Sequence, residues 1–529
     1  MLIKRDFYIN GAWVAPLNGT DHHVIDPSTE EPCATISLGG SEDADAAVAA
    51  AKAALPGWMH ADPAERIALV EMLISAYEAR ADDLAEAMSA EMGAPIDMAR
   101  SSQAGAGTWH LKNFVKDAKG FQFNRPLGDH APGDRIIYEP VGVAALITPW
   151  NWPMNQVTLK VGAAAIAGCT MVLKPSEESP LNAMIFAELM DEVGFPAGVF
   201  NLVNGDGVGV GTALSGHKDV DMVSFTGSSR AGTLISKNAA DTLKRVHLEL
   251  GGKGANLIFE DADEKAVKRG VLHMMNNTGQ SCNAPSRMLV QRGIYDRVVD
   301  EAAAVADKVS VGPASESGRH IGPVVNEVQW NKIQGLIEKG ISEGAKLVAG
   351  GPGRPEGFNK GFYVRPTVFA DVTNDMTIAR EEIFGPVLSI IPFETEEEAV
   401  EIANDTPYGL TNYVQTQDTG RANRLATQLR SGMVEMNGTS RAAGSPFGGM
   451  KQSGNGREGG VWGIEDFLEV KSVSGWAAAW STFTSTDAPP AMALRRLRPP
   501  PTSPGTRESP PSSRARSRAS SRSRRPAPL

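Results

Sequence analysis

The sequence of 529 residues has few cysteines and no long apolar run, and both shortages exclude classes of protein. Three cysteines, Cys33, Cys169 and Cys282, cannot build a disulfide framework, and their odd number suits a reducing compartment. No stretch approaches the roughly 20 apolar residues that a membrane-spanning helix needs. The opening residues, MLIKRDFYINGAW, lack the apolar region of a signal peptide because charged residues interrupt them early. We therefore expect a cytoplasmic protein with no membrane association.

The chain also lacks metal-ligand spacing among its Cys and His residues, and it shows no internal repeat, so we expect no metal site. The net charge is −11, although the segment from Ser481 to Leu529 carries ten Arg against one Asp and one Glu. The rest of the chain is therefore strongly acidic, which argues against nucleic-acid binding by the body of the protein.

Residues 477–529 are rich in Pro, Arg, Ser and Ala and contain almost no large hydrophobic side chains. Such a segment cannot bury a core, so we expect a disordered tail. Its Arg-Ser dipeptides could bind RNA or another anionic surface. We favour the alternative that the tail is an inert extension or a reading-frame artefact.

The remaining composition is that of a globular protein, with 42% hydrophobic and 21% charged residues. Near the N-terminus, Ser41 is the expected N-cap of an alanine-rich helix, and two further helices are expected to end at Gly93. From residue 141, apolar strands such as VGVAALITPW, TMVLKPSE and VDMVSFTGS alternate with helices. This alternation predicts a doubly wound, parallel α/β sheet with ligands at the carboxyl ends of its strands. A second α/β region extends from about residue 252 to 437.

Cys282 lies in the polar segment NNTGQSCNAPSR. A thiolate nucleophile needs an accessible, polar site, whereas a structural thiol prefers apolar neighbours such as those of Cys169. The local sequence leaves both roles open for Cys282. Glu249 ends an apolar strand just before two glycines. It could be a general base at the ligand edge of the sheet or simply a solvated strand end.

Several strand ends carry groups that suit a dinucleotide. Gly227 and Ser228, in FTGSSRAG, open a helix whose N-terminus can hold a pyrophosphate. Lys174 and Glu177, in KPSE, end a strand where a carboxylate typically binds ribose hydroxyls. The segment GDGVGVG, which contains Gly207, is a weaker signal because it departs from G-x-G-x-x-G. Together these strand ends favour a dinucleotide cofactor.

Seven motifs resemble, in order, the signatures of the aldehyde dehydrogenase superfamily: ITPWNWP, KPSE, FTGSSRAG, LELGGK, GQSC, EEIFGPV and PFGGMKQSGNGRE. The resemblance extends from about Phe7 to Gly475. It implies that Cys282 attacks an aldehyde carbonyl, while Asn151 and the backbone N–H of Cys282 stabilise the oxyanion. Hydride loss then leaves a thioester, which Glu249 hydrolyses by activating water, with Glu458 relaying protons. Glu249 argues against transfer to CoA, and the intact set of groups argues against a catalytically silent protein.

The resemblance further implies NAD as the cofactor. Charge repulsion between Glu177 and a 2′-phosphate makes NADP the less favoured alternative. The expected cofactor contacts are Ile147, Thr148, Trp150, Lys174, Ser176, Glu177, Gly207, Gly227, Ser228, Leu250, Gln329, Glu382 and Phe384. Trp152 and Phe447 are expected to line the tunnel for a small-molecule aldehyde, with a plain packing role as the alternative for Phe447. Trp152 stands where Phe or Tyr is commoner, so it either favours flat aromatic or unsaturated aldehydes or reflects a packing difference.

The family fold implies three parts. Residues 1–120 and 141–250 are the expected NAD-binding domain, and residues 251–455 the expected catalytic domain. Residues 121–140 form the expected β oligomerisation flap, which residues 456–476 complete with a closing strand. A projecting hairpin of this kind leaves an unpaired edge, which predicts a homodimer or homotetramer.

Overall fold

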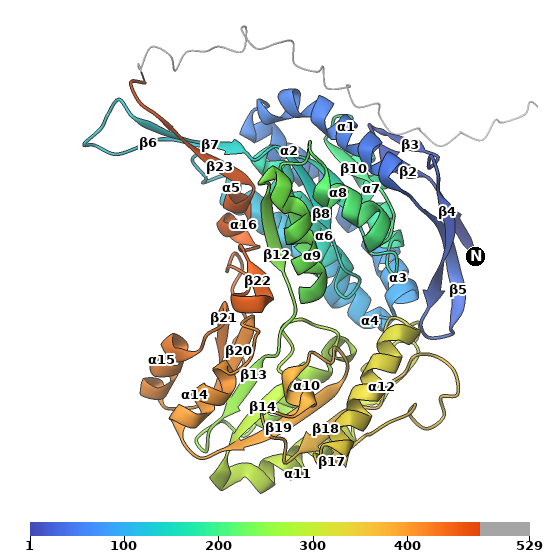
Figure 1. The fold of residues 1–529 in the computed structure, drawn as a ribbon, viewed down its shortest axis with the longest axis vertical. Coiled ribbons are helices and arrows are strands. Elements are labelled where there is room, and N and C mark those ends of the chain that lie inside the picture. The colour runs from blue at the N-terminus through green and yellow to red at the C-terminus, as the bar shows by residue number, and fades with distance from the viewer. Residues whose placement is uncertain (477–529) are drawn as a thin grey trace, which may run out of the picture. The chain divides into compact units, whose positions relative to one another are not determined.

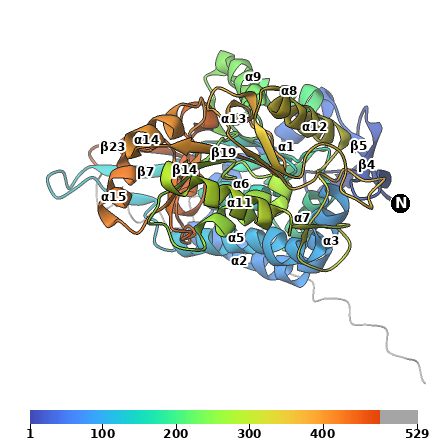
Figure 2. The same ribbon diagram turned by 90° about the horizontal axis from the view of Figure 1, so that it is seen from below.

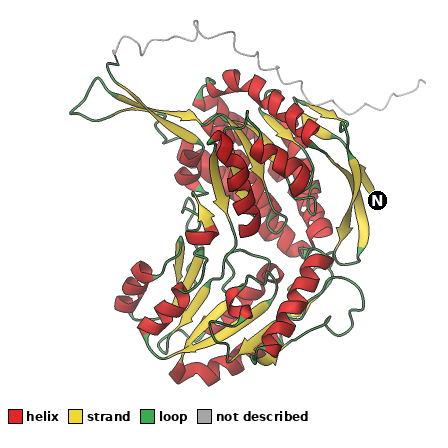
Figure 3. Ribbon diagram, in the orientation of Figure 1, coloured by secondary structure: helices red, strands yellow, loops and turns green. Residues whose placement is uncertain are grey.

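The computed structural model describes residues 1–476, and the predicted tail, 477–529, lies outside the described residues. Two large sheets dominate this part of the chain, each covered by helices (Figures 1 and 3). A helix long and apolar enough to cross a bilayer does not occur within residues 1–476. The same residues contain no cluster of His, Cys, Asp or Glu that could hold a metal ion.

The first large sheet has eight strands, of which the five central ones are parallel. In spatial order they are β22 (Gly454–Asn455), β12 (Arg245–Glu249), β11 (Met222–Thr226), β8 (Val143–Ile147), β9 (Thr170–Lys174), β10 (Phe200–Leu202), β2 (Phe7–Ile9) and β3 (Ala12–Val14). The chain runs outward from β8 through β9 to β10 and then crosses to β11 and β12. The predicted doubly wound sheet is therefore confirmed, and its topological switch point lies between β8 and β11, where ligands bind in such folds.

Strand β8 shows why these central strands have continuously apolar sequences. Val143, Ala145 and Ile147 belong to a core shared with the alanine-rich first helix, whereas Ala144 and Leu146 belong to the core on the opposite face. Successive side chains of a strand point to opposite faces, so burial of both faces requires apolar residues at every position.

The second large sheet has seven strands, and only its edge strand β17 is antiparallel to its neighbour. In spatial order they are β17 (Lys346–Ala349), β18 (Thr367–Ala370), β19 (Val387–Phe393), β14 (Arg287–Gln291), β13 (Ala255–Ile258), β20 (Thr411–Gln415) and β21 (Met433–Met436). Two separate clusters of buried side chains cover its two faces. This sheet matches the second α/β region that the sequence predicts.

Helices pack on both faces of the sheets. In chain order they are α1 (Ser41–Met59), α2 (Pro63–Ala79), α3 (Ala81–Met92), α4 (Ile96–Met98), α5 (Gly105–Ala118), α6 (Pro153–Ala167), α7 (Leu181–Glu192), α8 (Thr212–Gly216), α9 (Ser229–Ala239), α10 (Ala266–Met275), α11 (Tyr295–Ala306), α12 (Glu327–Ser342), α13 (Thr377–Arg380), α14 (Glu396–Asn404), α15 (Thr419–Gln428) and α16 (Gly460–Asp466). Helices α2 and α5 pack with α6 on one side of the first sheet, and α8 and α9 lie on the other (Figure 2).

The first helices test two predictions about helix ends. Helix α3 ends at Gly93, which has a left-handed φ of 80°, as predicted. The predicted N-cap at Ser41 is wrong, because Gly40 is the cap and Ser41 is the first helical residue. The Asp43 carboxylate accepts a hydrogen bond from the Gly40 backbone N–H at 3.0 Å, which satisfies the helix start from within the first turn.

Three smaller sheets complete the described residues. They are β1 (Leu2–Lys4) with β5 (Glu31–Leu38) and β4 (Thr20–Asp26); β15 (Ser310–Val311) with β16 (His320–Ile321); and β23 (Leu468–Val473) with β7 (Arg135–Pro140) and β6 (Asn124–Pro126). The β6–β7–β23 sheet extends away from α5 and α16 (Figure 1). It joins the two segments that the sequence analysis assigns to an oligomerisation flap.

Candidate active site

Cys282 lies in the loop between a short 3₁₀ turn, Asn276–Gly279, and β14. Asn277, Thr278 and Gly279 all have positive φ, and a Cβ at position 279 would collide with the carbonyl of Gly385. Glycine is therefore required for this loop to approach so closely. The Cys282 side chain is half-buried. Burial raises the pKa of its thiol well above the usual range, and the nearby Glu382 and Glu249 carboxylates raise it further, so the thiol is protonated in the resting protein.

Asn151 links the first sheet to the cysteine loop. It follows β8, just before α6, and its side chain is buried. Its Nδ2 donates a hydrogen bond to the backbone carbonyl of Gln280 at 2.9 Å. Its own backbone carbonyl accepts hydrogen bonds from Asn277 Nδ2 at 2.8 Å and Gln103 Nε2 at 3.1 Å. These bonds fix the Asn151 amide beside the segment that carries Cys282.

Glu249 is the last residue of β12 and is 2% exposed. Burial raises the pKa of its carboxyl to about 7, although the hydrogen bond from His247 lowers it. The loop that carries the PFGGMKQSGNGRE motif passes directly over this carboxylate, because Gly454 pairs with Glu249 and a Cβ at Gly448 would come within 2.7 Å of Glu249 Oε1. A buried carboxyl with a pKa near neutrality is suited to general acid–base chemistry.

A buried ion pair lies close to Glu249. Lys160 Nζ, on α6, donates to Glu458 Oε1 at 2.6 Å and to Ser224 Oγ at 3.0 Å. Glu458 raises the pKa of Glu249 by like-charge repulsion, and Lys160 lowers it. The predicted relay residue Glu458 is therefore electrostatically coupled to the predicted base.

Most of the predicted cofactor residues of the first sheet lie at the carboxyl ends of β8, β9 and β11 or just after them. These residues are Ile147, Thr148, Trp150, Lys174, Ser176, Glu177, Gly227 and Ser228. Lys174 Nζ donates to Glu177 Oε2 at 3.2 Å. Ser228 caps α9, where its Oγ accepts a hydrogen bond from Ala231 N at 3.3 Å. The buried Leu250 follows β12, and Gly207 begins a π-helical turn after β10.

The other predicted cofactor residues come from the second α/β region. Glu382 Oε1 accepts a hydrogen bond from the Gly252 backbone N–H at 2.9 Å, and burial raises the pKa of the Glu382 carboxyl. Phe384 has a left-handed φ of 61°, and its ring meets the Trp150 ring edge-on at 5.5 Å. Gln329 Nε2 contacts the Phe384 carbonyl at 3.4 Å. The Trp150–Phe384 contact joins the cofactor residues of the two sheets.

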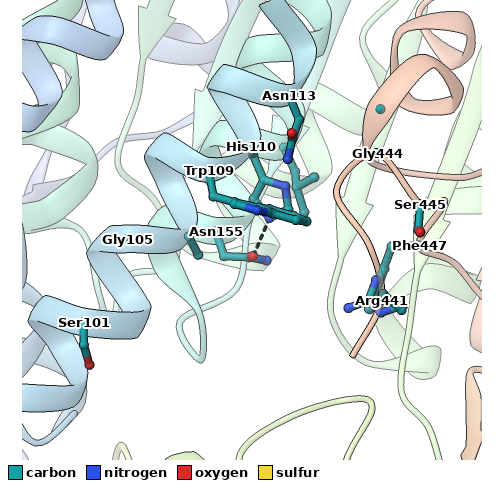
Figure 4. Close-up of a pocket in the computed structure, with 14 residues that line it drawn as sticks. Ser101, Gly105, Trp109, His110, Asn113, Asn155, Arg441, Gly444, Ser445 and Phe447 are labelled. Carbon is teal, nitrogen blue, oxygen red and sulfur yellow. Dashed lines mark hydrogen bonds between the residues drawn. The ribbon is translucent and has the colours of Figure 1, made fainter. Parts of the chain in front are cut away.

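The two predicted tunnel residues lie in different surroundings. Trp152 Nε1 donates to Ser281 Oγ at 2.8 Å, beside the cysteine. Phe447 lines a cavity of about 430 Å³ between α5, α6 and the segment from Arg441 to Gly460, and Trp152 is not among the residues that line it (Figure 4). The sequence did not predict the polar residues of this lining, which include Arg441 and His110. Lys160 and His247 were not identified as partners of the site either.

His247 could have been found from the strand periodicity. It lies two residues before Glu249 on β12, so both side chains point to the same face. Arg441 gave no such signal, because it belongs to an irregular segment between β21 and β22.

Comparison with known proteins identifies the family. The sequence profile of the aldehyde dehydrogenase family matches residues 13–473. The chain is 51% identical over 474 residues to 3-succinoylsemialdehyde-pyridine dehydrogenase of a Pseudomonas species. This alignment covers 89% of this chain and 98% of that relative. The crystal structure of an aldehyde dehydrogenase from Bartonella henselae matches with a TM-score of 0.89 and 59% identity, over 90% of this chain and 100% of the other.

A mutant of aldehyde dehydrogenase C from Pseudomonas syringae, solved with NAD⁺ and octanal, has a TM-score of 0.88 and 48% identity, over 90% of this chain and 97% of the other. The chain belongs to the aldehyde dehydrogenase family. The predicted family, the predicted fold class and the prediction of an oxidoreductase acting on aldehydes are confirmed.

Proposed function

We propose that this protein oxidises an aldehyde to a carboxylic acid with NAD as hydride acceptor, with Cys282 as nucleophile and Glu249 as general base. The observation that carries this proposal is the convergence of three groups. Asn151 is hydrogen-bonded to the loop of Cys282, and the Glu249 carboxylate raises the pKa of the Cys282 thiol through its charge. A nucleophile, a base and an oxyanion donor are the groups that acyl chemistry at a carbonyl carbon requires.

The first step is activation of the thiol. Because the Cys282 thiol is protonated at rest, a base must remove its proton before attack. Glu249, with a pKa of about 7, is substantially ionised at neutral pH and accepts that proton. The thiolate then attacks the carbonyl carbon to give a tetrahedral thiohemiacetal. One Nδ2 hydrogen of Asn151 is used by Gln280, and the other stabilises the oxyanion.

The residues of the cofactor site fit a dinucleotide. The first turn of α9 contains no acidic side chain, and the N-terminus of this helix suits a pyrophosphate. Glu177, held by Lys174, is a carboxylate acceptor for ribose hydroxyls. When bound, NAD accepts the hydride that the thiohemiacetal loses. The NAD⁺ complexes of aldehyde dehydrogenases from Pseudomonas syringae and Bacillus cereus support this assignment.

The last step is hydrolysis of the thioester on Cys282. Glu249 first gives up the proton that it took from the thiol and then removes a proton from water. The hydroxide attacks the acyl carbon, the C–S bond breaks, and the carboxylic acid leaves as the Cys282 thiolate is released. The released proton then passes from Glu249 toward the Lys160–Glu458 pair, which lies in the same buried region. The base makes water the acyl acceptor, so we expect no requirement for CoA.

The test is NADH formation by purified protein with a panel of aliphatic, aromatic and semialdehyde substrates, with and without CoA. We expect aldehyde-dependent NADH without CoA. Cys282→Ala abolishes it, and Cys33→Ala, at a half-buried thiol outside the site, serves as the matched control. Activity only in the presence of CoA would refute the role given to Glu249. A folded protein that binds NAD but oxidises no aldehyde would refute the oxidation itself.

A further inference from the structure

The cavity between α5, α6 and the segment from Arg441 to Gly460 has a volume of about 430 Å³, which is within the range that small-molecule sites occupy. Asn155, in the first turns of α6, lies four residues after Asn151. Phe447 exchanges two backbone hydrogen bonds, of 2.8 and 2.7 Å, with Glu458. The cavity is therefore connected through the chain to Asn151, the proposed oxyanion donor, and to Glu458, the proposed proton relay.

Arg441 is the one cationic side chain in the described lining of this cavity. Its guanidinium lies over the Phe447 ring at 4.7 Å, and its Nε contacts Glu435 Oε1 at 3.3 Å. Within residues 1–476, neither of its Nη groups has a hydrogen-bond partner. The ring and Glu435 thus hold the guanidinium in place while leaving its two outer donors for a ligand.

The wall opposite Arg441 also presents donors (Figure 4). His110 is neutral near pH 7, because burial lowers its pKa to about 4, and its Nε2 donates to Asn155 Oδ1 at 2.7 Å. This bond occupies the Asn155 acceptor and leaves its amide N–H groups. Asn113 Nδ2 is buried and has no partner among the described residues. A cavity lined by unused donors is complementary to a ligand group that only accepts hydrogen bonds.

The charges around the cavity point the same way. Glu435 offsets part of the charge of Arg441 through Nε, but no carboxylate belongs to the described lining itself. The positive field of Arg441 reaches both His110 and Cys282, because it lowers the pKa of each group. An anion bound at Arg441 therefore lies within electrostatic range of the nucleophile.

We propose that the aldehyde carries a carboxylate at the end remote from the carbonyl, and that Arg441 binds this carboxylate through its two Nη groups. A guanidinium holds a carboxylate with two parallel hydrogen bonds, which fixes the position of the ligand as well as its charge. Trp109 and Phe447 supply the apolar walls for the carbon chain between the two ends. This inference rests on the proposed aldehyde oxidation and names the class of substrate.

The experiment compares two matched pairs of aldehydes, each differing by one carboxylate. They are glutaric semialdehyde with pentanal, and para-carboxybenzaldehyde with benzaldehyde. We expect the carboxylate to raise kcat/KM in each pair for the wild type. Arg441→Gln removes the cation, and we expect the ratio of kcat/KM for charged over neutral aldehyde to fall on the order of ten- to a hundredfold, mainly through KM. Added salt weakens the preference in the wild type and has little effect in the variant.

The matched control is Arg292→Gln, which removes an exposed arginine that pairs with Glu394 and does not line the cavity. We expect it to leave both kinetic constants unchanged. Thermal unfolding of Arg441→Gln establishes that the variant is folded, and Arg441→Lys should restore part of the preference. Equal use of charged and neutral aldehydes, or a preference for the carboxylated aldehydes that Arg441→Gln does not alter, would overturn this inference alone. NADH formation from no aldehyde at all would instead overturn the proposed oxidation.

Discussion

The imidazole Nε2 of His247 lies 3.5 Å from Oε1 of Glu249, and both side chains are buried. The other ring nitrogen, Nδ1, contacts a carboxylate oxygen of Asp466, which is partly exposed. Burial lowers the pKa of His247, but its contacts with Asp466 and Glu249 outweigh burial and raise that pKa to about 9. The ring is therefore a cation at neutral pH. It favours the ionised form of Glu249 and connects the buried base to a carboxylate that reaches solvent.

This arrangement predicts the effect of His247→Gln on the pH dependence of kcat/KM. The proposed base must be ionised, so activity should be lost as pH falls through the pKa of Glu249, about 7. Glutamine keeps a hydrogen-bond donor but removes the cation, while the repulsion from Glu458 remains. We expect the acidic limb to move to higher pH by on the order of one unit.

The control for this prediction is His60→Gln, at the exposed end of α1, which should leave the pH profile unchanged. The measurement is kcat/KM across the acidic and neutral range at fixed ionic strength. An unshifted limb in His247→Gln would mean that the charge of His247 does not act on the base.

Glu249→Gln separates the two halves of the proposed reaction. The variant cannot activate water, so hydrolysis of the thioester on Cys282 should become limiting. Glu458 or solvent then takes the thiol proton more slowly than Glu249 does, and NADH forms in a burst of up to one equivalent per site. Steady turnover should then fall on the order of a hundredfold or more. Stopped-flow absorbance of NADH measures both phases, and Glu260→Gln, at an exposed carboxylate after β13, is the control. Unchanged steady turnover would exclude Glu249 as the base.

The sequence predicts the parts of this protein that follow from local patterning. Continuous apolar strands require two covered faces, as β8 has, and Gly93 is placed at a helix end by its left-handed φ. The capping of α1 is mispredicted because the helix begins one residue earlier than the sequence suggests. Asp43 accepts from the Gly40 N–H, whereas the Ser41 hydroxyl donates to Glu42 and caps no backbone group. The pattern of polar residues does not decide which of them becomes the first helical residue.

The cavity could not be predicted for a related reason. Its donors come from α5, from α6 and from an irregular segment around Arg441, and their convergence depends on how two sheets and their helices pack. The motif residues were predictable as a set through the resemblance of their order and spacing. Their individual roles, including those of the thirteen cofactor residues and of the two tunnel residues, stay predictions that the experiments test.

Cofactor choice should depend on Glu177. Its carboxylate is held by Lys174 at 3.2 Å, near the end of β9, where the 2′ position of an adenosine ribose is expected. A 2′-phosphate there meets like charge, so Glu177→Gln should lower KM for NADP on the order of tenfold and raise KM for NAD through loss of the acceptor. Steady-state kinetics with both cofactors measures the change, and Glu192→Gln, exposed at the end of α7, is the control. A lower KM for NAD in Glu177→Gln would contradict the assignment.

The β6–β7–β23 sheet should mediate oligomerisation. Strand β23 lies at its edge, so one row of its backbone groups has no partner strand within residues 1–476, and Val470 on this strand is 64% exposed. An exposed edge with an apolar side chain is a template for pairing with another subunit. We expect a dimer or tetramer by sedimentation velocity. Val470→Glu should weaken association on the order of a hundredfold, because an unpaired carboxylate is costly to bury. Leu243→Glu, at an exposed apolar residue before β12, is the control. A monomeric wild type, or a Val470→Glu variant that assembles normally, would show that this sheet is not the interface.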